Sequence, residues 1–345
     1  MLACIYNEEG KMELVEKERP QAKADTAVMR VLATSICGTD FRTYLYGSQK
    51  ISPGTTLGHE MCGEIVEIGA LVKGFSTGDI VTVTPALGCG KCRMCKKGHT
   101  NMCDHLETLG FQYDGSFAQY MEIPARYFET GSVNLVPQGV AYADAALAEP
   151  IACAINAQEF LCIGKGDYVA IFGSGFIGCM HAELAFASGA GKVIMIEPNE
   201  ARRQAAGELV PDIHMLRGGD GLLGQVMELT DGRGVDVAVV ACSVGAAQSD
   251  AMRIIGKRGR ISLFGGLPSE SCGFLDSNII HYKELGVYGV HASTTPQNRK
   301  ALEWIAQGKI DAGKFITKKY ALENILEALE DIRTKGIMKA VVSFT

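Results

Sequence analysis

Residues 168–178 read YVAIFGSGFIG. The first five letters form a short apolar run of strand-forming residues, and the other six form a Gly-x-Gly-x-x-Gly turn. The residues that follow, from Cys179 to Ser188, are typical of a helix. In a strand–turn–helix of this kind the first glycine permits the turn, and the second lets the backbone approach a pyrophosphate at the helix N-terminus. The pattern predicts a dinucleotide-binding site at Gly173, Gly175, Phe176, Ile177 and Gly178.

An acidic residue comes directly after the next strand candidate. The apolar run from Val193 to Ile196 ends before Glu197. A carboxylate at this place accepts hydrogen bonds from the adenosine ribose hydroxyls. It would also repel the 2′-phosphate of NADP, so we expect NAD as the cofactor. Arg202 is a further candidate for cofactor binding and leaves NADP open, whereas we interpret Arg203 as a surface cation of a helix.

The alternation of strands and helices continues beyond this unit. Residues 235–241 and 260–264 read as strands, and residues 246–255 between them read as a helix. This order is typical of a doubly wound parallel sheet. The chain before residue 150 instead has short strand runs punctuated by glycines, which indicates an irregular β-rich domain. After residue 286 we predict helices at 297–306 and 322–333 and a last strand at 339–343.

Four cysteines lie close together between residues 89 and 103. Their spacing is Cys-x2-Cys-x2-Cys-x7-Cys, and glycines in the loops allow the chain to wrap around one ion. Four thiolates complete the tetrahedral shell of zinc, so we expect a structural zinc site. An iron–sulfur cluster uses related spacings and is the alternative. The predicted ligands are Cys89, Cys92, Cys95 and Cys103.

A second set of metal-binding side chains is spread along the chain. Cys37 follows a strand-like run from Thr26 to Thr34, His59 and Glu60 precede another such run, and Glu149 stands before Pro150, in the first turn of a helix expected near Ala152. A catalytic zinc keeps three protein ligands and one open position, where it makes a bound alcohol more acidic. Cys37 alone would read as a buried structural cysteine. Its combination with the cysteine cluster and the glycine turn predicts metal-assisted hydride transfer.

The overall composition is typical of an ordinary soluble globular protein. The chain has 345 residues, 47% of them hydrophobic, and a net charge of −6 with a pI near 5.7. The acidic balance argues against nucleic acid as a partner. No apolar run is long enough for a membrane span, and no secretory signal is present, so we expect a cytoplasmic protein. In that compartment the twelve cysteines are expected to be thiols and metal ligands.

Motifs along nearly the whole chain resemble the zinc-containing alcohol dehydrogenases of the medium-chain dehydrogenase/reductase superfamily. The resemblance is greatest with the sorbitol (polyol) and threonine dehydrogenase branch, whose members have glutamate where the liver-type enzymes have a second cysteine. Besides the glycine turn and the four cysteines, the motifs are Cys37-Gly38-Thr39-Asp40, Gly58-His59-Glu60, Gly78-Asp79-Ile80-Val81, Gly115 to Tyr120, and Glu149-Pro150.

The resemblance implies an α/β protein with two domains. Residues 1–149 and 287–345 would form a β-rich catalytic domain like chaperonin-10 (GroES-like), and residues 150–286 would form the NAD-binding Rossmann domain. It also implies one catalytic and one structural zinc per chain, a small-molecule alcohol or polyol substrate, and a homo-oligomer, with a tetramer favoured. No nucleic acid or membrane partner is expected.

The family pattern assigns roles to single residues. Cys37 and His59 resemble zinc ligands, and Glu60 and Glu149 are both candidates for the remaining carboxylate position. Thr39 resembles the first member of a proton relay that runs on to the nicotinamide ribose, with a helix N-cap as its other interpretation.

Two departures from the pattern leave the substrate open. Arg42 stands where many relatives have a relay histidine, and it either binds an anionic substrate group or forms a surface salt bridge. The stretch from Val287 to His291 lacks the arginine–tyrosine pair of animal-type polyol dehydrogenases. His291 is expected in the substrate site or as a structural histidine. Tyr44, Tyr46 and Phe111 are candidates for pocket walls or core packing.

The sequence therefore predicts an NAD-dependent dehydrogenase that oxidises a secondary alcohol of a polyol or sugar-like compound to a ketone. The alternatives are a phosphorylated-polyol dehydrogenase and an L-threonine 3-dehydrogenase-like enzyme. Outside enzymes, the alternative is a catalytically silent nucleotide-binding protein.

Overall fold

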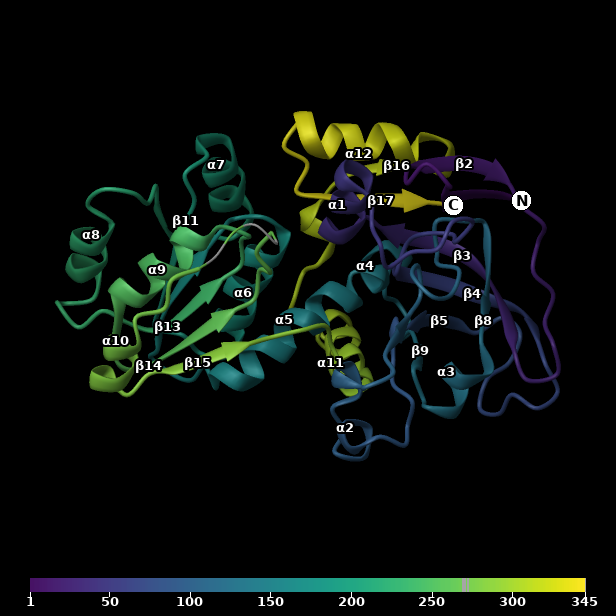
Figure 1. Ribbon diagram of the computed structural model, residues 1–345, viewed down its shortest axis with the longest axis horizontal. Coiled ribbons are helices and arrows are strands. Elements are labelled where there is room, and N and C mark those ends of the chain that lie inside the picture. The colour runs from purple at the N-terminus through teal and green to yellow at the C-terminus, as the bar shows by residue number, and fades with distance from the viewer. Residues whose placement is uncertain (269–270, 272, 345) are drawn as a thin grey trace. The chain divides into compact units, whose positions relative to one another are not determined.

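The computed structural model describes residues 1–268, 271 and 273–344, and these fall into two compact units. Unit 1 comprises residues 1–152 and 292–345, and unit 2 comprises residues 153–291 (Figure 1). The expected domain boundaries, at 149/150 and 286/287, lie a few residues before these divisions.

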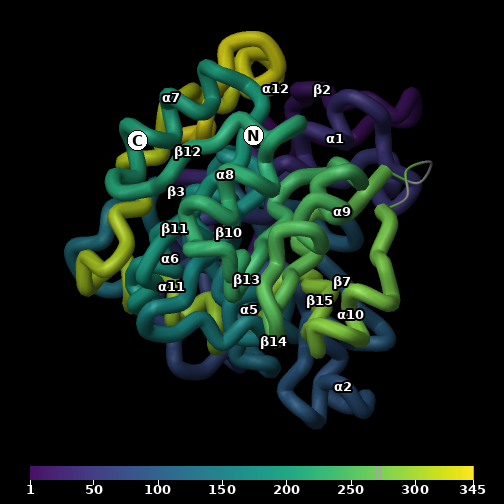
Figure 2. Tube along the Cα trace, turned by 90° about the vertical axis from the view of Figure 1, so that its left-hand side faces the viewer, coloured from purple at the N-terminus to yellow at the C-terminus, as the bar shows by residue number. Residues whose placement is uncertain are grey.

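Unit 2 is built on a parallel sheet with the strand order β12-β11-β10-β13-β14-β15 among the described residues (Figure 2). The chain runs from β10 toward one edge and from β13 toward the other, which is the doubly wound arrangement expected from the sequence. The elements are β10 (Tyr168–Phe172), α6 (Phe176–Ala187), β11 (Lys192–Ile196), α7 (Glu200–Leu209), β12 (His214–Leu216), α8 (Leu222–Leu229), β13 (Val235–Val240), α9 (Gly245–Ile254), β14 (Ile255–Leu263), α10 (Ser277–Lys283) and β15 (Gly286–Gly289).

The central strands of unit 2 are continuous apolar runs because a parallel sheet is buried on both faces. Val169, Ala170 and Ile171 of β10 have no exposed surface, and neither do Val193 and Ile194 of β11. Two predicted boundaries were wrong. β14 begins at Ile255 rather than at residue 260, because its first residue already pairs with β13, and α6 begins at Phe176, directly after the turn.

Unit 1 is β-rich, and its main sheet has the order β16-β17-β3-β4-β5-β9, with β8 paired to β3. The N-terminal part contributes β1 (Leu2–Tyr6), β2 (Met12–Glu16), β3 (Ala27–Ser35), α1 (Gly38–Tyr46), β4 (Glu60–Ile68), β5 (Ile80–Val83), β6 (Ala86–Leu87), α2 (Arg93–Lys96), η1 (Thr100–Met102), β7 (Glu107–Thr108), β8 (Tyr120–Ile123), α3 (Ala125–Glu129), β9 (Val133–Leu135), α4 (Tyr142–Ala146) and the start of α5 (Ala148–Leu161). The C-terminal part contributes α11 (Thr295–Ala306), η2 (Gly313–Phe315), β16 (Ile316–Tyr320), η3 (Leu322–Asn324), α12 (Ile325–Thr334) and β17 (Lys339–Ser343).

The C-terminal segment completes the sheet of unit 1. β17, at the residues predicted for the last strand, pairs antiparallel with β3, so that Val341 lies opposite Ser35. This pairing places the C-terminal strand beside the strand that leads to Cys37. The expected helix near Ala152 begins earlier, at Ala148, and Glu149 lies in its first turn.

Candidate active site and metal centres

Cys37 lies at the junction between β3 and α1. It is the N-cap of α1, and its Sγ accepts a hydrogen bond from the Thr39 backbone N–H at 3.4 Å. The Asp40 carboxylate in turn accepts one from the Cys37 backbone N–H at 2.9 Å. The two bonds fix the thiol at the start of the helix. Because Cys37 is the cap, the interpretation of Thr39 as an N-cap was wrong.

The pairing of β3 with β4 brings the other ligand candidates to Cys37. Ser35 lies opposite Glu60, the first residue of β4, and His59 directly precedes that strand. Gly58 has φ +92°, and a Cβ atom there would lie 2.5 Å from the Phe117 ring, so the tight approach requires glycine. As a result, potential ligand atoms of Cys37, His59 and Glu60 all lie within 4.8 Å of one another.

Glu60 is 1% exposed, and its two carboxylate oxygens have different surroundings. Oε2 accepts hydrogen bonds from the Ser35 hydroxyl and from Lys339 Nζ, the latter at 2.6 Å. Oε1 is buried and has no hydrogen-bond partner among the described residues. A buried carboxylate oxygen without a partner is costly, and a cation at the cluster would satisfy it. The thiol, imidazole and carboxylate donors are those that zinc prefers, so the residues fit a zinc ion.

The electrostatic surroundings of His59 also favour positive charge. Burial alone would lower the pKa of His59, but the negative charges of Asp40 and Cys37 raise it well above its usual value. Asp40 Oδ1 lies 3.5 Å from His59 Nδ1, and burial raises the pKa of Asp40. A metal ion would occupy this anionic environment in place of the proton. A carboxylate beside a ligand histidine also orients the ring, a role for Asp40 that sequence reasoning missed.

Glu149 belongs to the same electrostatic environment. Its charge raises the pKa values of both His59 and Lys339, although it is not part of the three-residue cluster. The structure therefore brings Glu60 close to Cys37 and His59 and places Glu149 within electrostatic reach of them.

The candidate substrate residues have different surroundings. The ring of Phe111 lies 5.9 Å from that of His59, beside the cluster, and Tyr44 packs against the core that contains the β1–β2 hairpin and α12. Arg42 is exposed on α1. His291 is an exposed residue at the end of unit 2, and its backbone carbonyl accepts a hydrogen bond from Asn156.

The four-cysteine cluster forms a compact second group whose potential ligand atoms lie within 4.8 Å of one another. Backbone N–H groups point at the sulfurs, as in the bonds from Cys89 to the Cys103 Sγ at 3.1 Å and from Cys92 to the Cys89 Sγ at 3.3 Å. Hydrogen bonds from backbone N–H groups, first that of Cys95, lower the pKa of Cys92 to about 6. Burial instead raises the pKa of the Cys95 thiol to about 12, so the loop by itself favours the thiolate at Cys92, and a bound zinc ion would be needed to hold Cys95 in that form.

The glycine turn of unit 2 has the backbone geometry of a phosphate-binding turn. Gly173 has φ +101°, and a Cβ atom on Gly178 would lie 2.0 Å from the Gly173 carbonyl oxygen, so α6 packs against the turn only with glycine there. Gly175 is the N-cap of α6. The Glu197 carboxylate accepts hydrogen bonds from the Ser174 backbone N–H at 3.1 Å and from the Asn199 backbone N–H at 3.0 Å. The acidic residue is therefore held beside the turn.

Comparison with known proteins identifies the family. Residues 23–131 match the alcohol dehydrogenase GroES-like domain, and residues 177–307 match the zinc-binding dehydrogenase domain. An L-threonine 3-dehydrogenase of Pyrococcus furiosus is 34% identical, with 95% of this chain and 94% of that protein covered. This chain belongs to the zinc-containing alcohol dehydrogenase family.

Two further proteins are similar to this chain over more than nine tenths of its length. A sorbitol dehydrogenase of Bacillus subtilis is 32% identical over 96% of this chain and 93% of that protein. The crystal structure of a zinc-binding dehydrogenase from Sinorhizobium meliloti bound to NADP has a TM-score of 0.90 and 28% identity, over 99% of this chain and 98% of that one. The predicted fold, a GroES-like domain with a Rossmann domain, is confirmed. The chain is a zinc-dependent alcohol dehydrogenase with a nicotinamide cofactor and a small-molecule alcohol substrate.

Proposed function

We propose that this alcohol dehydrogenase oxidises a secondary alcohol of a polyol or sugar-like compound to a ketone and reduces NAD. The observation that carries the proposal is the Cys37–His59–Glu60 cluster, in which Glu60 Oε1 has no hydrogen-bond partner within the described part of the chain. Relatives that act on sorbitol and on threonine support a secondary alcohol as the reacting group. The Glu197 carboxylate beside the glycine turn supports NAD, because it would repel a 2′-phosphate.

In this proposal unit 1 holds the catalytic zinc and unit 2 holds NAD. Bound zinc would lower the pKa of the substrate hydroxyl, and bound NAD would accept the hydride. Cys37, His59 and Glu60 would be the zinc ligands, with Glu149 as the second carboxylate able to approach the ion. The Thr39 hydroxyl, two residues after Cys37, would receive the proton of the substrate hydroxyl. Cys89, Cys92, Cys95 and Cys103 would hold a structural zinc.

Asp40 and Lys339 would act on this site without contact to the substrate. Asp40 caps α1 at the Cys37 backbone and faces His59, so it positions two ligands at once. Lys339 holds Glu60 Oε2, which leaves Oε1 for the metal ion. Phe111 would form an apolar wall beside His59, where it excludes water from the reacting atoms.

A phosphorylated polyol is the second candidate substrate, and the position of Arg42 favours it. The guanidinium is exposed on α1, the helix that Cys37 caps, one helical turn beyond Thr39, where it could bind a phosphate. Rates of NAD reduction on matched pairs, each a polyol and its phosphate ester, separate the two with zinc-loaded protein. Preference for the neutral polyol supports the proposal, and preference for the ester makes Arg42 an anion anchor. A folded, zinc-loaded protein that reduces NAD with neither substrate nor with threonine would instead indicate a silent nucleotide-binding protein.

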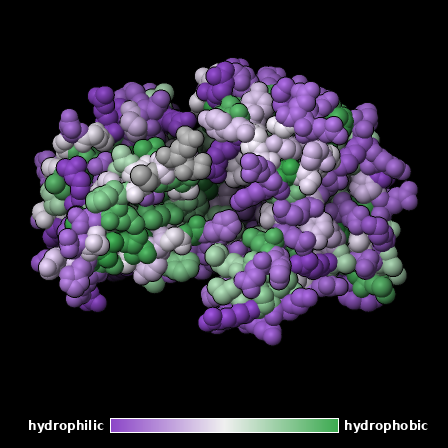
Figure 3. Space-filling model, viewed as in Figure 1, coloured by the Kyte–Doolittle hydropathy of each residue, from purple (hydrophilic) through white to green (hydrophobic). Residues whose placement is uncertain are grey.

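A homo-oligomer, with a tetramer favoured, and a cytoplasmic location complete the proposal. β15 is an edge strand of the sheet of unit 2 among the described residues, and Figure 3 shows apolar side chains gathered over the part of that unit which holds β14 and β15. An open strand edge with apolar surface is a common site of subunit pairing. The described residues include no helix that could cross a membrane. Light scattering coupled to size exclusion tests the oligomer.

A further inference from the structure

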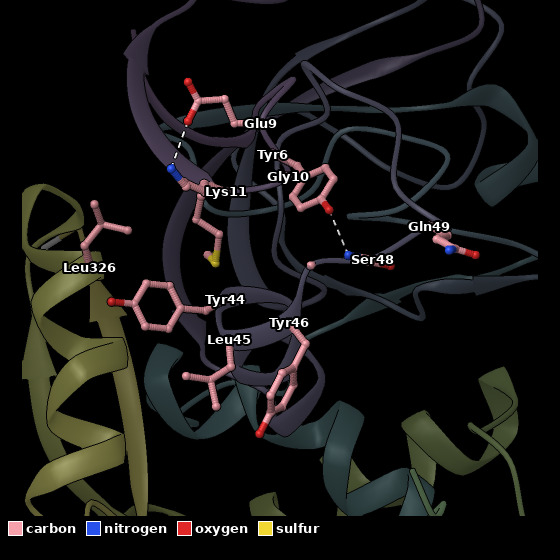
Figure 4. A pocket seen from close by; sticks show the side chains of 12 residues that line it. Tyr6, Glu9, Gly10, Lys11, Tyr44, Leu45, Tyr46, Ser48, Gln49 and Leu326 are labelled. Carbon is pink, nitrogen blue, oxygen red and sulfur yellow. Dashed lines mark hydrogen bonds and ion pairs between the residues drawn. The ribbon is translucent and has the colours of Figure 1, made fainter. Parts of the chain in front are cut away.

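Unit 1 contains a pocket of about 670 Å³ at the C-terminal end of α1 (Figure 4). Its size is within the range of small-molecule sites. Three segments that are distant in sequence form its walls, namely the β1–β2 hairpin, the end of α1 with the loop after it, and Leu326 of α12. None of the proposed zinc ligands lines it. Because α1 rises about 1.5 Å per residue, Tyr46 lies roughly 13 Å along the helix from Cys37.

Tyr6 gives this pocket a fixed polar group. The residue is 7% exposed, and its hydroxyl accepts a hydrogen bond from the Ser48 backbone N–H at 2.8 Å. The same hydroxyl lies against Gly10 and Gly47, where a Cβ atom would come within 3.2 and 3.0 Å of it. The bond from Ser48 is the one hydrogen bond that the described residues give to this oxygen, so its own O–H remains able to donate. A buried, immobilised donor thus lines the pocket.

The other residues that line the pocket contribute aromatic rings, uncharged polar groups and one pair of opposite charges. Tyr44 and Tyr46 contribute rings, and Tyr46 is 82% exposed (Figure 4). Glu9 and Lys11 form an ion pair at 2.9 Å on the hairpin side. Ser48 and Gln49 add a hydroxyl and an amide. A lining without net charge does not select an anion, whereas rings beside many donors and acceptors suit a molecule with C–H faces and several hydroxyls.

We propose that this pocket binds a neutral polyhydroxylated small molecule, such as a polyol or a sugar, as a second site separate from the zinc cluster. The ligand would lie against the rings of Tyr44 and Tyr46 and would accept a hydrogen bond from the Tyr6 hydroxyl. The Glu9–Lys11 pair would supply one acceptor and further donors. This inference goes beyond the proposed oxidation, because it does not depend on which alcohol reacts at the zinc cluster.

Saturation-transfer NMR on the zinc-loaded full chain without NAD tests the site, with methyl α-D-glucopyranoside as the neutral probe and glucose 6-phosphate as the charged one. We expect the neutral probe to bind, and Tyr46→Ala to raise its Kd at least tenfold. Leu135→Ala, which removes an apolar side chain that is 55% exposed on β9 of the same unit, should leave the Kd unchanged. Tyr6→Phe removes only the hydroxyl and should raise the Kd by a smaller factor.

Three results would overturn the inference. The first is a wild-type protein that does not bind the neutral probe. The second is a Tyr46→Ala variant that binds it as tightly as wild type, and a changed oligomeric state in that variant would then assign the surface to subunit contact. The third is tighter binding of glucose 6-phosphate, which would make the pocket an anion site. Turnover of the wild-type enzyme is measured separately, so failure here leaves the proposed oxidation intact.

Discussion

The Lys339 ammonium lies 2.6 Å from the Glu60 carboxylate, although the two residues are 279 positions apart in the sequence. Both are buried, with 5% and 1% exposure, and Lys339 also donates to the Ile36 carbonyl at 3.0 Å. Burial lowers the pKa of Lys339, but Glu60 and Cys37 more than compensate and raise it, so the lysine stays charged. The last strand of the chain therefore supplies the cation that faces the proposed zinc ligands.

Replacement of this lysine should be costly. Lys339→Met leaves the buried Glu60 Oε2 without its ammonium partner, and loss of one partner of a buried pair destabilises a protein by about 3–5 kcal/mol. We expect a loss of that size in the free energy of unfolding, measured in urea on zinc-loaded protein. Lys319→Met, at an exposed position of the neighbouring strand, is the control and should cost little. Equal stability of the two variants would show that the pair contributes nothing to the fold.

Replacement of Cys37 should abolish turnover while the protein stays folded and still binds NAD. Cys37→Ser removes a thiolate from the three-residue cluster, so we expect turnover to fall by at least a thousandfold while NAD still binds to unit 2. NAD binding is measured by calorimetry, and zinc content by mass spectrometry. Cys162→Ser, which changes an exposed cysteine in unit 2, should keep full activity. Near-normal rates in Cys37→Ser would remove this cluster from the active site.

Replacement of a cysteine in the four-cysteine cluster should instead lower the stability of the protein and leave turnover largely intact. Cys92→Ser opens the tetrathiolate shell, so the bound zinc should fall from two ions per chain to one, and the midpoint of thermal unfolding should fall with it. Turnover per chain that still carries the catalytic ion should stay within a few-fold of wild type, measured well below the new midpoint. A selective loss of turnover in fully folded protein would contradict a structural role for this site.

Most strands and helices of unit 2 could be predicted from the sequence, because each is encoded by a short local pattern of residues. The run from Tyr168 to Phe172 forms β10 at the expected residues, because a buried parallel strand is a continuous apolar run and the turn after it needs its glycines. The first part of β14 escaped prediction for a physical reason. The stretch from Gly256 to Arg260 holds glycines and charged residues. Ile255 pairs with Val235 and Arg260 with Val237, so most of this stretch lies in a register shift between the two pairs, which no local pattern predicts.

The partners in the candidate site could not be predicted from local pattern. Lys339 opens an apolar run and reads as the exposed end of a strand, yet pairing of β17 with β3 buries it beside Glu60. Asp40 reads as a helix-capping residue, which it is, and its second role toward His59 depends on the register of β3 with β4. The sequence feature that could have indicated this second role is the position of Asp40, an acidic residue three positions after the candidate ligand Cys37.

The C-terminal helix offers a test of pH dependence. The buried Asp331 carboxylate accepts hydrogen bonds from Lys318 at 2.8 Å and Tyr320 at 2.9 Å, and Lys335 lies 2.8 Å away. Lys318 and then Lys335 hold the pKa of Asp331 well below its usual range. A lowered folded-state pKa stabilises the protein above the unfolded value of about 3.9, and this stabilisation is lost as the pH falls below it.

Asp331→Asn should therefore be less stable than wild type at pH 7, and the difference should shrink between pH 5 and pH 3. Urea unfolding at several pH values measures it. Glu330→Gln, on the same helix, breaks the solvent-exposed pair with Arg333 and should change stability little at any pH. A difference between Asp331→Asn and wild type that stays constant down to pH 3 would show that the charge of Asp331 is not the source of its effect.

Cofactor choice rests on Glu197, whose two oxygens are held by Ser174 and Asn199 at the glycine turn. Arg203 cannot readily bind a phosphate, because its guanidinium donates to the carbonyls of Glu197 and Pro198 and pairs with Glu200. Glu197→Ala removes the repulsion of a 2′-phosphate, so the ratio of kcat/KM for NAD to that for NADP should fall at least tenfold. This ratio distinguishes a loss of ribose recognition from a distorted glycine turn, because a distorted turn would weaken the binding of NAD and NADP alike. Glu208→Ala removes the same charge at an exposed position of α7, where the carboxylate accepts a hydrogen bond from Gln204, and it should leave the ratio near wild type. Equal shifts in the two variants would reduce the effect to general electrostatics and exclude Glu197 from the ribose site.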